Sequence, residues 1–172
     1  MFSFLRTKPD KTEFEKLVNN YHESVYNFVR RRVGNHDDSA DITQEVFIRA
    51  YRNLNSLKDP SAAKSWIFRI AANETIRFIT DKYRQTHVSV ETQPVVEPIA
   101  PEAVNLSSSQ INERFNKALT LLSPRQRNVF DLRYFQELSY EEIAEALNSN
   151  VGTMKATYHI AKEKIAGFIL EK

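Results

Sequence analysis

The stretch LSPRQRNVFDLRYFQELSYEEIAEALNSNVGTMKATYHIAKEKI (residues 122–165) decides the fold of the last third of the chain. Ser139 and Glu142 have the spacing of a capping box, in which each side chain accepts a hydrogen bond from a backbone amide at a helix start. Apolar residues follow at helical spacing. The polar run 148–150 then supplies a sharp turn, because asparagine tolerates the left-handed backbone conformation. With a second helix starting near Val151, the pattern predicts a helix-turn-helix, which places its second helix in the DNA major groove.

The second helix of this unit has two different faces at 100° per residue. One face is apolar and is predicted to meet the core, with Met154, Tyr158 and Ile165 among its members. The opposite face carries small, hydrogen-bonding and cationic groups, which suit base edges and phosphates. The candidate DNA-reading residues are Thr153, Lys155, Ala156, His159 and Ile160.

The composition excludes several classes of function. The 172 residues suit one ordinary domain or two small ones, and the absence of cysteine excludes disulfides and thiolate metal sites. Three scattered glycines cannot form a phosphate-cradling loop, and the four histidines lack metal-ligand spacing. We therefore expect no catalytic residue, no cofactor and no metal. No apolar run is long enough to span a membrane, so we expect a cytoplasmic protein without direct membrane insertion.

Caps and helix breakers divide the whole chain into helices. Thr12 with Glu15 and Ser123 with Gln126 have capping-box spacing, and Asp59-Pro60 suits an N-cap followed by a first helical residue. The expected helices span residues 12–33, 38–57, 60–83, 109–122, 124–135, 140–147 and 151–170.

Between these helices, residues 85–108 contain three prolines and three glutamates, but no glycine, lysine or arginine. This composition predicts a semi-extended acidic linker. The sequence therefore predicts an all-α fold of two small helical bundles, residues 10–84 and 109–172, joined by a flexible linker. The C-terminal bundle contains the helix-turn-helix.

Three stretches, in this order and spacing, resemble bacterial RNA polymerase sigma factors of the extracytoplasmic-function group. They are DITQEVFIRAYRNL (residues 41–54), SWIFRIAANETIRF (residues 65–78) and the C-terminal stretch quoted above. The resemblance implies a protein that is not itself an enzyme and that directs core RNA polymerase to promoters through the −10 and −35 elements. The implied partners are the polymerase, through its β′ coiled coil and β flap, promoter DNA and an anti-sigma factor.

The expected second helix has the faces of a protein-binding element. Val46, Phe47 and Ala50 form a buried stripe, while an isoleucine stands among charged residues on the outward face, which indicates a protein partner. In sigma factors the matching surface docks on the β′ coiled coil. The resemblance therefore implies polymerase contacts for Asp41, Gln44, Glu45 and Ile48.

The third expected helix combines an apolar face with a face that carries amide and guanidinium groups, which suit unpaired bases and phosphates. Similar sigma factors open the −10 element with this helix and the loop before it. The resemblance implies −10 contacts for Asn73 and Arg77, with Lys58 and Lys64 as backbone contacts. Trp66 is expected to pack in the core, because a lone tryptophan is usually mostly buried.

The recognition helix departs from the family pattern. Asn148 stands where the turn usually has glycine, Ala156 where serine is common, and Ile160 where a basic residue is common. Fewer cations predict weaker phosphate anchoring and a different −35 preference. The implied −35 contacts are clearest for Lys155 and His159.

Two other functions fit parts of the sequence. A helix-turn-helix regulator of the response-regulator output type would suit the C-terminal stretch, but it would not need the motif at residues 41–54. A helical scaffold that binds only proteins would leave the outward face of the last helix unexplained.

Overall fold

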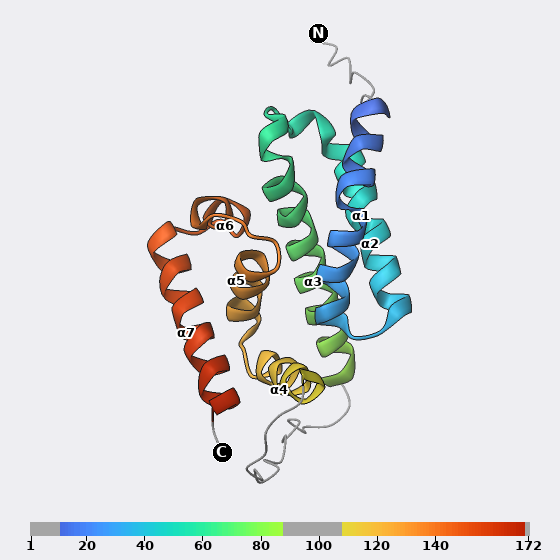
Figure 1. Ribbon diagram of the computed structural model, residues 1–172. Helices are drawn as coiled ribbons and strands as arrows, with labels where there is room; N and C mark the ends of the chain where they lie inside the picture. Colours follow the sequence, from blue (N-terminus) through green and yellow to red (C-terminus); the bar gives the residue numbers. More distant parts are fainter. Residues whose placement is uncertain (1–10, 88–107, 171–172) are drawn as a thin grey trace. The chain divides into compact units, whose positions relative to one another are not determined.

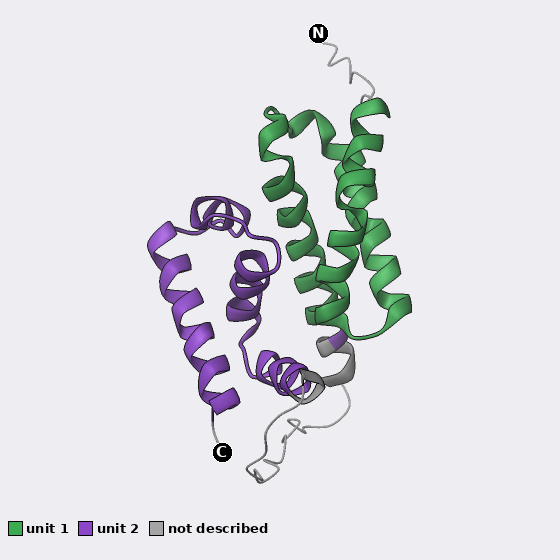
Figure 2. Ribbon diagram, in the orientation of Figure 1, with its two compact units in different colours: residues 1–81 green, residues 82–172 purple. Residues whose placement is uncertain are grey.

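Figure 1 shows the helices of the computed structural model, which describes residues 11–87 and 108–170. Every described element is a helix, and the chain divides into two compact units, residues 1–81 and 82–172 (Figure 2). The all-α fold class is thereby confirmed. The elements are α1 (Lys11–Val33), α2 (His36–Asn53), the 3₁₀ turns η1 (Leu54–Ser56) and η2 (Pro60–Ala62), α3 (Ala63–His87), α4 (Ser108–Thr120), α5 (Pro124–Tyr134), α6 (Tyr140–Ala146) and α7 (Val151–Leu170).

The first unit buries apolar side chains from α1, α2 and α3. α1 packs along α2, and Phe28 of α1 meets Phe68 of α3 edge to face with ring centroids 5.6 Å apart. Both rings are fully buried, and burial of each contributes about 1.5–3 kcal/mol to folding. Val46 and Ala50 of α2 are also fully buried, and Trp66 of α3 is nearly so. The predicted inward faces of α2 and α3 are confirmed.

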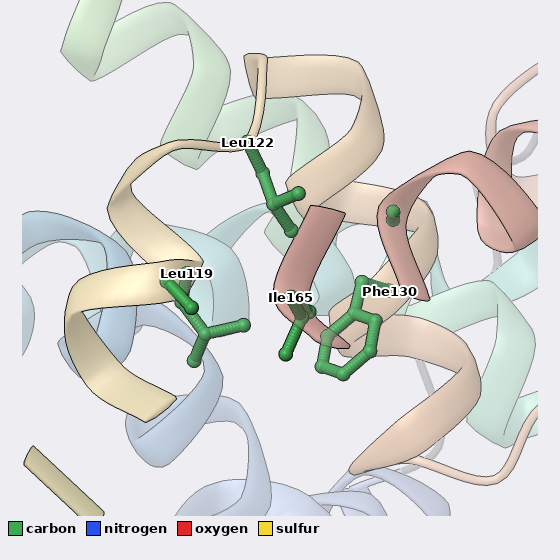
Figure 3. Packing of buried hydrophobic residues seen from close by; sticks show 6 residues of the cluster. Leu119, Leu122, Phe130 and Ile165 are labelled. Atoms are coloured by element: carbon green, nitrogen blue, oxygen red, sulfur yellow. The ribbon is translucent and has the colours of Figure 1, made fainter. Parts of the chain in front are cut away.

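In the second unit, α7 packs against α4, α5 and α6. Figure 3 shows how Leu119 of α4, Phe130 of α5 and Ile165 of α7 come together with Leu122, which lies between α4 and α5. Met154, one turn into α7, is fully buried, as its place on the apolar stripe predicted. This core fixes α7 by one face and leaves the other outward.

The capping boxes at Ser123 and Ser139 are confirmed. The amide of Ser139 donates to Glu142 Oε2 at 2.7 Å, and the amide of Glu142 donates to Ser139 Oγ at 3.1 Å. In the turn that follows α6, Asn148 has φ 47°, within the left-handed region. The helix-turn-helix therefore has the geometry that its sequence predicted.

The first two helices begin earlier than expected. α1 already includes Lys11, so Thr12 lies inside the helix and is not its N-cap. α2 begins at His36 instead of Asp38, because the Asn35 side chain caps it by accepting the Asp38 amide at 2.8 Å. The sequence contains no capping box at this point, which is why the boundary was misplaced.

The third helix also differs at both ends. The Asp59 side chain accepts the amide of Ser61, but the first turn is the 3₁₀ turn η2, and the α-helix proper begins at Ala63. α3 continues to His87, beyond the expected end and into the expected linker. Residues 88–107, the rest of that linker but for its last residue, lie outside the described part of the chain.

Candidate functional site

The outward face of α2 presents the four residues predicted to bind the polymerase. Asp41, Gln44 and Ile48 are exposed, while Glu45 is half-buried. Arg49, one turn further along α2, donates from Nε to Glu45 Oε1 at 2.8 Å. The four residues thus share one side of α2, opposite the core, as their spacing predicted.

An apolar groove runs beside these residues, and the sequence alone did not indicate it. Its volume is about 990 Å³, and its walls come from both α1 and α2. Phe14 of α1 and Tyr51 of α2 meet edge to face with ring centroids 5.0 Å apart. Ile48 and Tyr51 line the groove and remain 37% and 40% exposed, an unusual exposure for large apolar residues in this unit. Charged groups and an open apolar groove therefore adjoin one another on α2.

The structure separates the residues predicted to contact the −10 element. Asn73 and Arg77 are exposed one turn apart on α3, whereas Lys58 lies in the loop before η2 and Lys64 in the first turn of α3. At 100° per residue, Lys64 points to the side of α3 opposite Asn73. It also lies about 20 Å from Arg77 along the helix axis. These four side chains do not form a single patch.

Trp66 shows how the loop before α3 is held. Its indole Nε1–H donates to Ser56 Oγ at 3.2 Å, and its side chain is nearly buried. The expectation that Trp66 packs in the core is confirmed.

Glu74 is the functional candidate that sequence reasoning missed. It is a carboxylate on α3 that is only 8% exposed, and it lies against Arg49 of α2. Its Oε1 lies 2.9 Å from Arg49 Nε, and its Oε2 lies 3.5 Å from Arg77 Nη1. Glu45, Arg49, Glu74 and Arg77 thus form a charge chain that joins the outward face of α2 to the outward face of α3. The available signal was the lone acidic residue in the middle of SWIFRIAANETIRF.

The outward face of α7 carries the residues predicted to read the −35 element. Lys155, Ala156, His159 and Ile160 are exposed, Ile160 by 44%. Thr153 is half-buried, and its amide donates to the side chain of Asn150, the residue before the helix, at 2.7 Å. The structure therefore keeps this set on one solvent-facing side of the recognition helix.

Neighbouring side chains orient two of these residues. Lys155 Nζ lies 5.8 Å from the centre of the Tyr140 ring, a cation–π distance, so the first helix of the motif guides the cation. His159 Nε2 lies 3.3 Å from Glu163 Oε1, one turn further along α7. Neither contact was predicted: Tyr140 belongs to another helix, and Glu163 was placed on the same outward face of the recognition helix as His159 without being paired with it.

Among the described residues, no group of three or more His, Asp or Glu side chains could hold a metal ion. The described helices are also too short or too polar for any of them to cross a membrane.

Comparisons with known proteins identify both units. The family model "Sigma-70 region 2" matches residues 17–85, and "Sigma-70, region 4" matches residues 112–165. The ECF RNA polymerase sigma factor SigW of Bacillus subtilis is 32% identical over 168 residues, covering 92% of this chain and 89% of SigW. The ECF RNA polymerase sigma-E factor of Escherichia coli K12 is 30% identical over 167 residues, covering 92% and 87%.

A solved structure shares the fold. The sigma factor RpoE of Bartonella quintana, in complex with the anti-sigma factor NepR, superposes with a TM-score of 0.72 at 22% identity, covering 94% of this chain and 99% of that one. The region 2 match over the first unit argues against a helix-turn-helix regulator of the response-regulator output type, because such a regulator does not need that unit. The chain belongs to the extracytoplasmic-function RNA polymerase sigma factors, which bind core RNA polymerase and direct it to promoters.

Proposed function

We propose that the two units of this sigma factor divide the work of initiation. Residues 10–84 bind core polymerase and the −10 element, residues 109–172 bind the −35 element, and residues 85–108 link them. The outward face of α2 carries this proposal, because it sets Asp41 and Gln44 beside an open apolar groove. A protein partner can bury the groove while its cations meet the carboxylates of Asp41 and Glu45.

The core-binding residues in this proposal are Asp41, Gln44, Glu45 and Ile48, with the β′ coiled coil as their partner. The test is the double substitution Asp41→Ala and Glu45→Ala in the full chain. Affinity for core polymerase should fall, because two charges that meet the partner are lost, while the fold should be kept, since neither residue belongs to the core. Unchanged affinity in a folded double variant would reject this surface.

For the −10 element, we assign Asn73 and Arg77 to the separated single strand and Lys58 to its backbone. Unpaired bases offer stacking surfaces and edges that duplex DNA hides, and an exposed amide with a guanidinium one turn away suits them. Because Lys64 lies on the other side of α3, its contact requires DNA that passes around the start of this helix. Asn73→Ala and Arg77→Ala should impair promoter opening more than initial duplex binding, as permanganate footprints would show.

For the −35 element, we assign Thr153, Lys155, Ala156, His159 and Ile160 to the major groove. The second unit is also assigned the contact with the β flap. An anti-sigma factor is a further proposed partner, since the B. quintana relative of this fold is held by one. The protein would act in the cytoplasm, where it meets the polymerase, and would contribute no catalysis of its own.

A further inference from the structure

The apolar groove between α1 and α2 is long and open to the surface. At one end Phe14 meets Tyr51, and at the other the hydroxyl of Tyr26 lies 2.8 Å from His36 Nδ1. Phe14 and Tyr26 are separated by about 18 Å along the axis of α1. The lining residues belong to these two helices, and Ile48 among them remains exposed. An extended segment of about this length can therefore lie along the groove.

The chain itself contains a segment of matching length directly before the groove. Residues 1–10, MFSFLRTKPD, lie outside the described part of the chain and lead into α1 at Lys11, about one turn before Phe14. The sequence KPD (residues 8–10) favours a turn, because proline presets the backbone of the position it occupies and aspartate suits the next one. Beyond such a turn, residues 1–6 span about 20 Å when extended. This reach matches the length of the groove.

The side chains of this segment suit an apolar groove. Phe2 and Phe4 fall on one face of an extended chain, because alternate side chains point the same way, and Leu5 falls on the other face. Val18 and Phe47 provide apolar walls for the two rings. The tether also holds the segment beside the groove at an effective concentration on the order of millimolar, so weak contacts are enough to keep it there. Any other occupant has to bind from dilute solution.

We propose that residues 1–6 dock along this groove in the free protein and cover it, with Phe2 and Phe4 as the anchoring side chains. Ile48 lies in the groove and is assigned to the polymerase, so the segment and the polymerase compete for the same surface. This competition rests on the proposed function, whereas the docking itself does not. The apparent affinity for the polymerase is reduced to the fraction of chains whose groove is open.

The first test detects the segment in the groove of the full-length chain. Because the chain has no cysteine, Ser3→Cys gives a single site for a nitroxide spin label, on the face of the segment opposite the two rings. The label should broaden the methyl resonance of Ile48 in NMR spectra. Phe2→Ser with Phe4→Ser in the same labelled chain should remove most of this broadening, and circular dichroism checks that the helices are kept.

Two results of this test would overturn the proposal. Equal broadening of Ile48 with and without the two rings would mean that the label is near the groove only because it is tethered there. In a mixed sample, the spin label is carried by one chain and the isotope label by another. Broadening of Ile48 in that sample would assign the contact to a second copy of the chain.

The second test measures the affinity of the unlabelled full-length chain for core polymerase. Phe2→Ser with Phe4→Ser should raise this affinity about fivefold, the gain expected if the segment covers the groove in roughly four-fifths of the free chains. Leu5→Ser is the matched control, because it removes an apolar side chain from the other face of the segment, and its gain should be clearly smaller. Equal gains would overturn the assignment of Phe2 and Phe4 as anchors.

Together the two tests separate this inference from the proposed function. If the spectra place the segment in the groove but the affinity for polymerase does not respond to Phe2→Ser with Phe4→Ser, the docking stands and the groove is not the polymerase site. If the spectra show no docking, the inference is rejected. The outward face of α2 is then still tested by the substitutions of Asp41 and Glu45.

Discussion

Single side chains on α7 differ in how far they reach and in what holds them. Lys155 has a long cationic side chain guided by the Tyr140 ring, so it can extend to a phosphate at the edge of the groove. His159 has a shorter side chain and lies one turn later, where it contacts Glu163. Its ring therefore stays near the centre of the outward face, where a base edge would lie. Residues on one face can therefore serve affinity and sequence selectivity separately.

These different positions lead to a prediction for −35 recognition. His159→Ala should change which bases are preferred, at a cost of about 1–3 kcal/mol for each lost base contact. Lys155→Ala should weaken binding evenly across sequences and reduce its salt dependence, if the lysine contacts a phosphate. Selection of −35 variants with both proteins would measure this. If wild type and His159→Ala select the same sequence, base reading belongs to other residues of α7.

Tyr158 gives the second unit a dependence on alkaline pH. Its pKa is raised above the usual 10.0, first by burial and then by the neighbouring phenol of Tyr140. The native state therefore holds the proton more tightly than the unfolded chain does. The resulting stability is fully present below pH 10 and is lost as pH rises through the raised pKa. Urea unfolding near pH 8 and pH 11 should show a larger loss for wild type than for Tyr158→Phe. Equal losses would show that Tyr158 does not carry this dependence.

Among the elements, α6 depends most on its ends, because it has only 7 residues. A helix of this length is marginal by itself, so its capping box and the buried Ile143 and Ala144 must hold it. The turn after it needs the left-handed conformation of Asn148 and a bond from the Ser149 amide to the Ala144 carbonyl at 2.8 Å. The orientation of α7 thus depends on local signals on both sides of α6.

The dependence of α6 on its cap can be measured directly. Ser139→Ala removes the acceptor for the Glu142 amide and should lower the free energy of unfolding of the second unit by about 1 kcal/mol. Ser139→Asp keeps an acceptor at the same place and should retain most of that stability. Urea unfolding of both variants would show the difference; equal stability of Ser139→Ala and wild type would mean that packing alone maintains α6.

Local signals also explain how much could be predicted from the sequence. The capping boxes at Ser123 and Ser139, the left-handed turn and the buried face of α7 follow from residues a few positions apart, and the structure has them, whereas the box expected at Thr12 falls inside α1. Glu74 could not be predicted to be buried, because its partner Arg49 comes from another helix and only packing brings them together. The side of α3 that carries Lys64 follows from helical periodicity alone. The early start of α2 at His36 instead depends on a side-chain bond from Asn35, which no capping-box pattern indicated.

At the scale of the molecule, each unit has its own buried apolar centre. In the second unit Phe130 lies at that centre and stacks on Tyr158 with ring centroids 5.7 Å apart. Phe28 and Phe68 have the corresponding place in the first unit. The stability of each unit should therefore respond to its own substitutions.

This separation leads to a prediction about unfolding. Phe130→Ala should destabilise the second unit by about 3–5 kcal/mol, because it leaves a cavity in a filled core. Amide hydrogen exchange of α4 to α7 should accelerate accordingly, while that of α1 and α2 should not change. Equal acceleration in both units would show that they unfold as a single cooperative body.

The bond between Trp66 and Ser56 has an optical consequence. The chain has one tryptophan, so all indole emission comes from the first unit. That indole is almost fully buried, and it donates a hydrogen bond to Ser56, in the segment between α2 and α3. When a strand of DNA displaces this loop, water should reach the ring and shift its emission to longer wavelength. Trp66 is thus an intrinsic fluorophore beside the segment that is proposed to contact the −10 element.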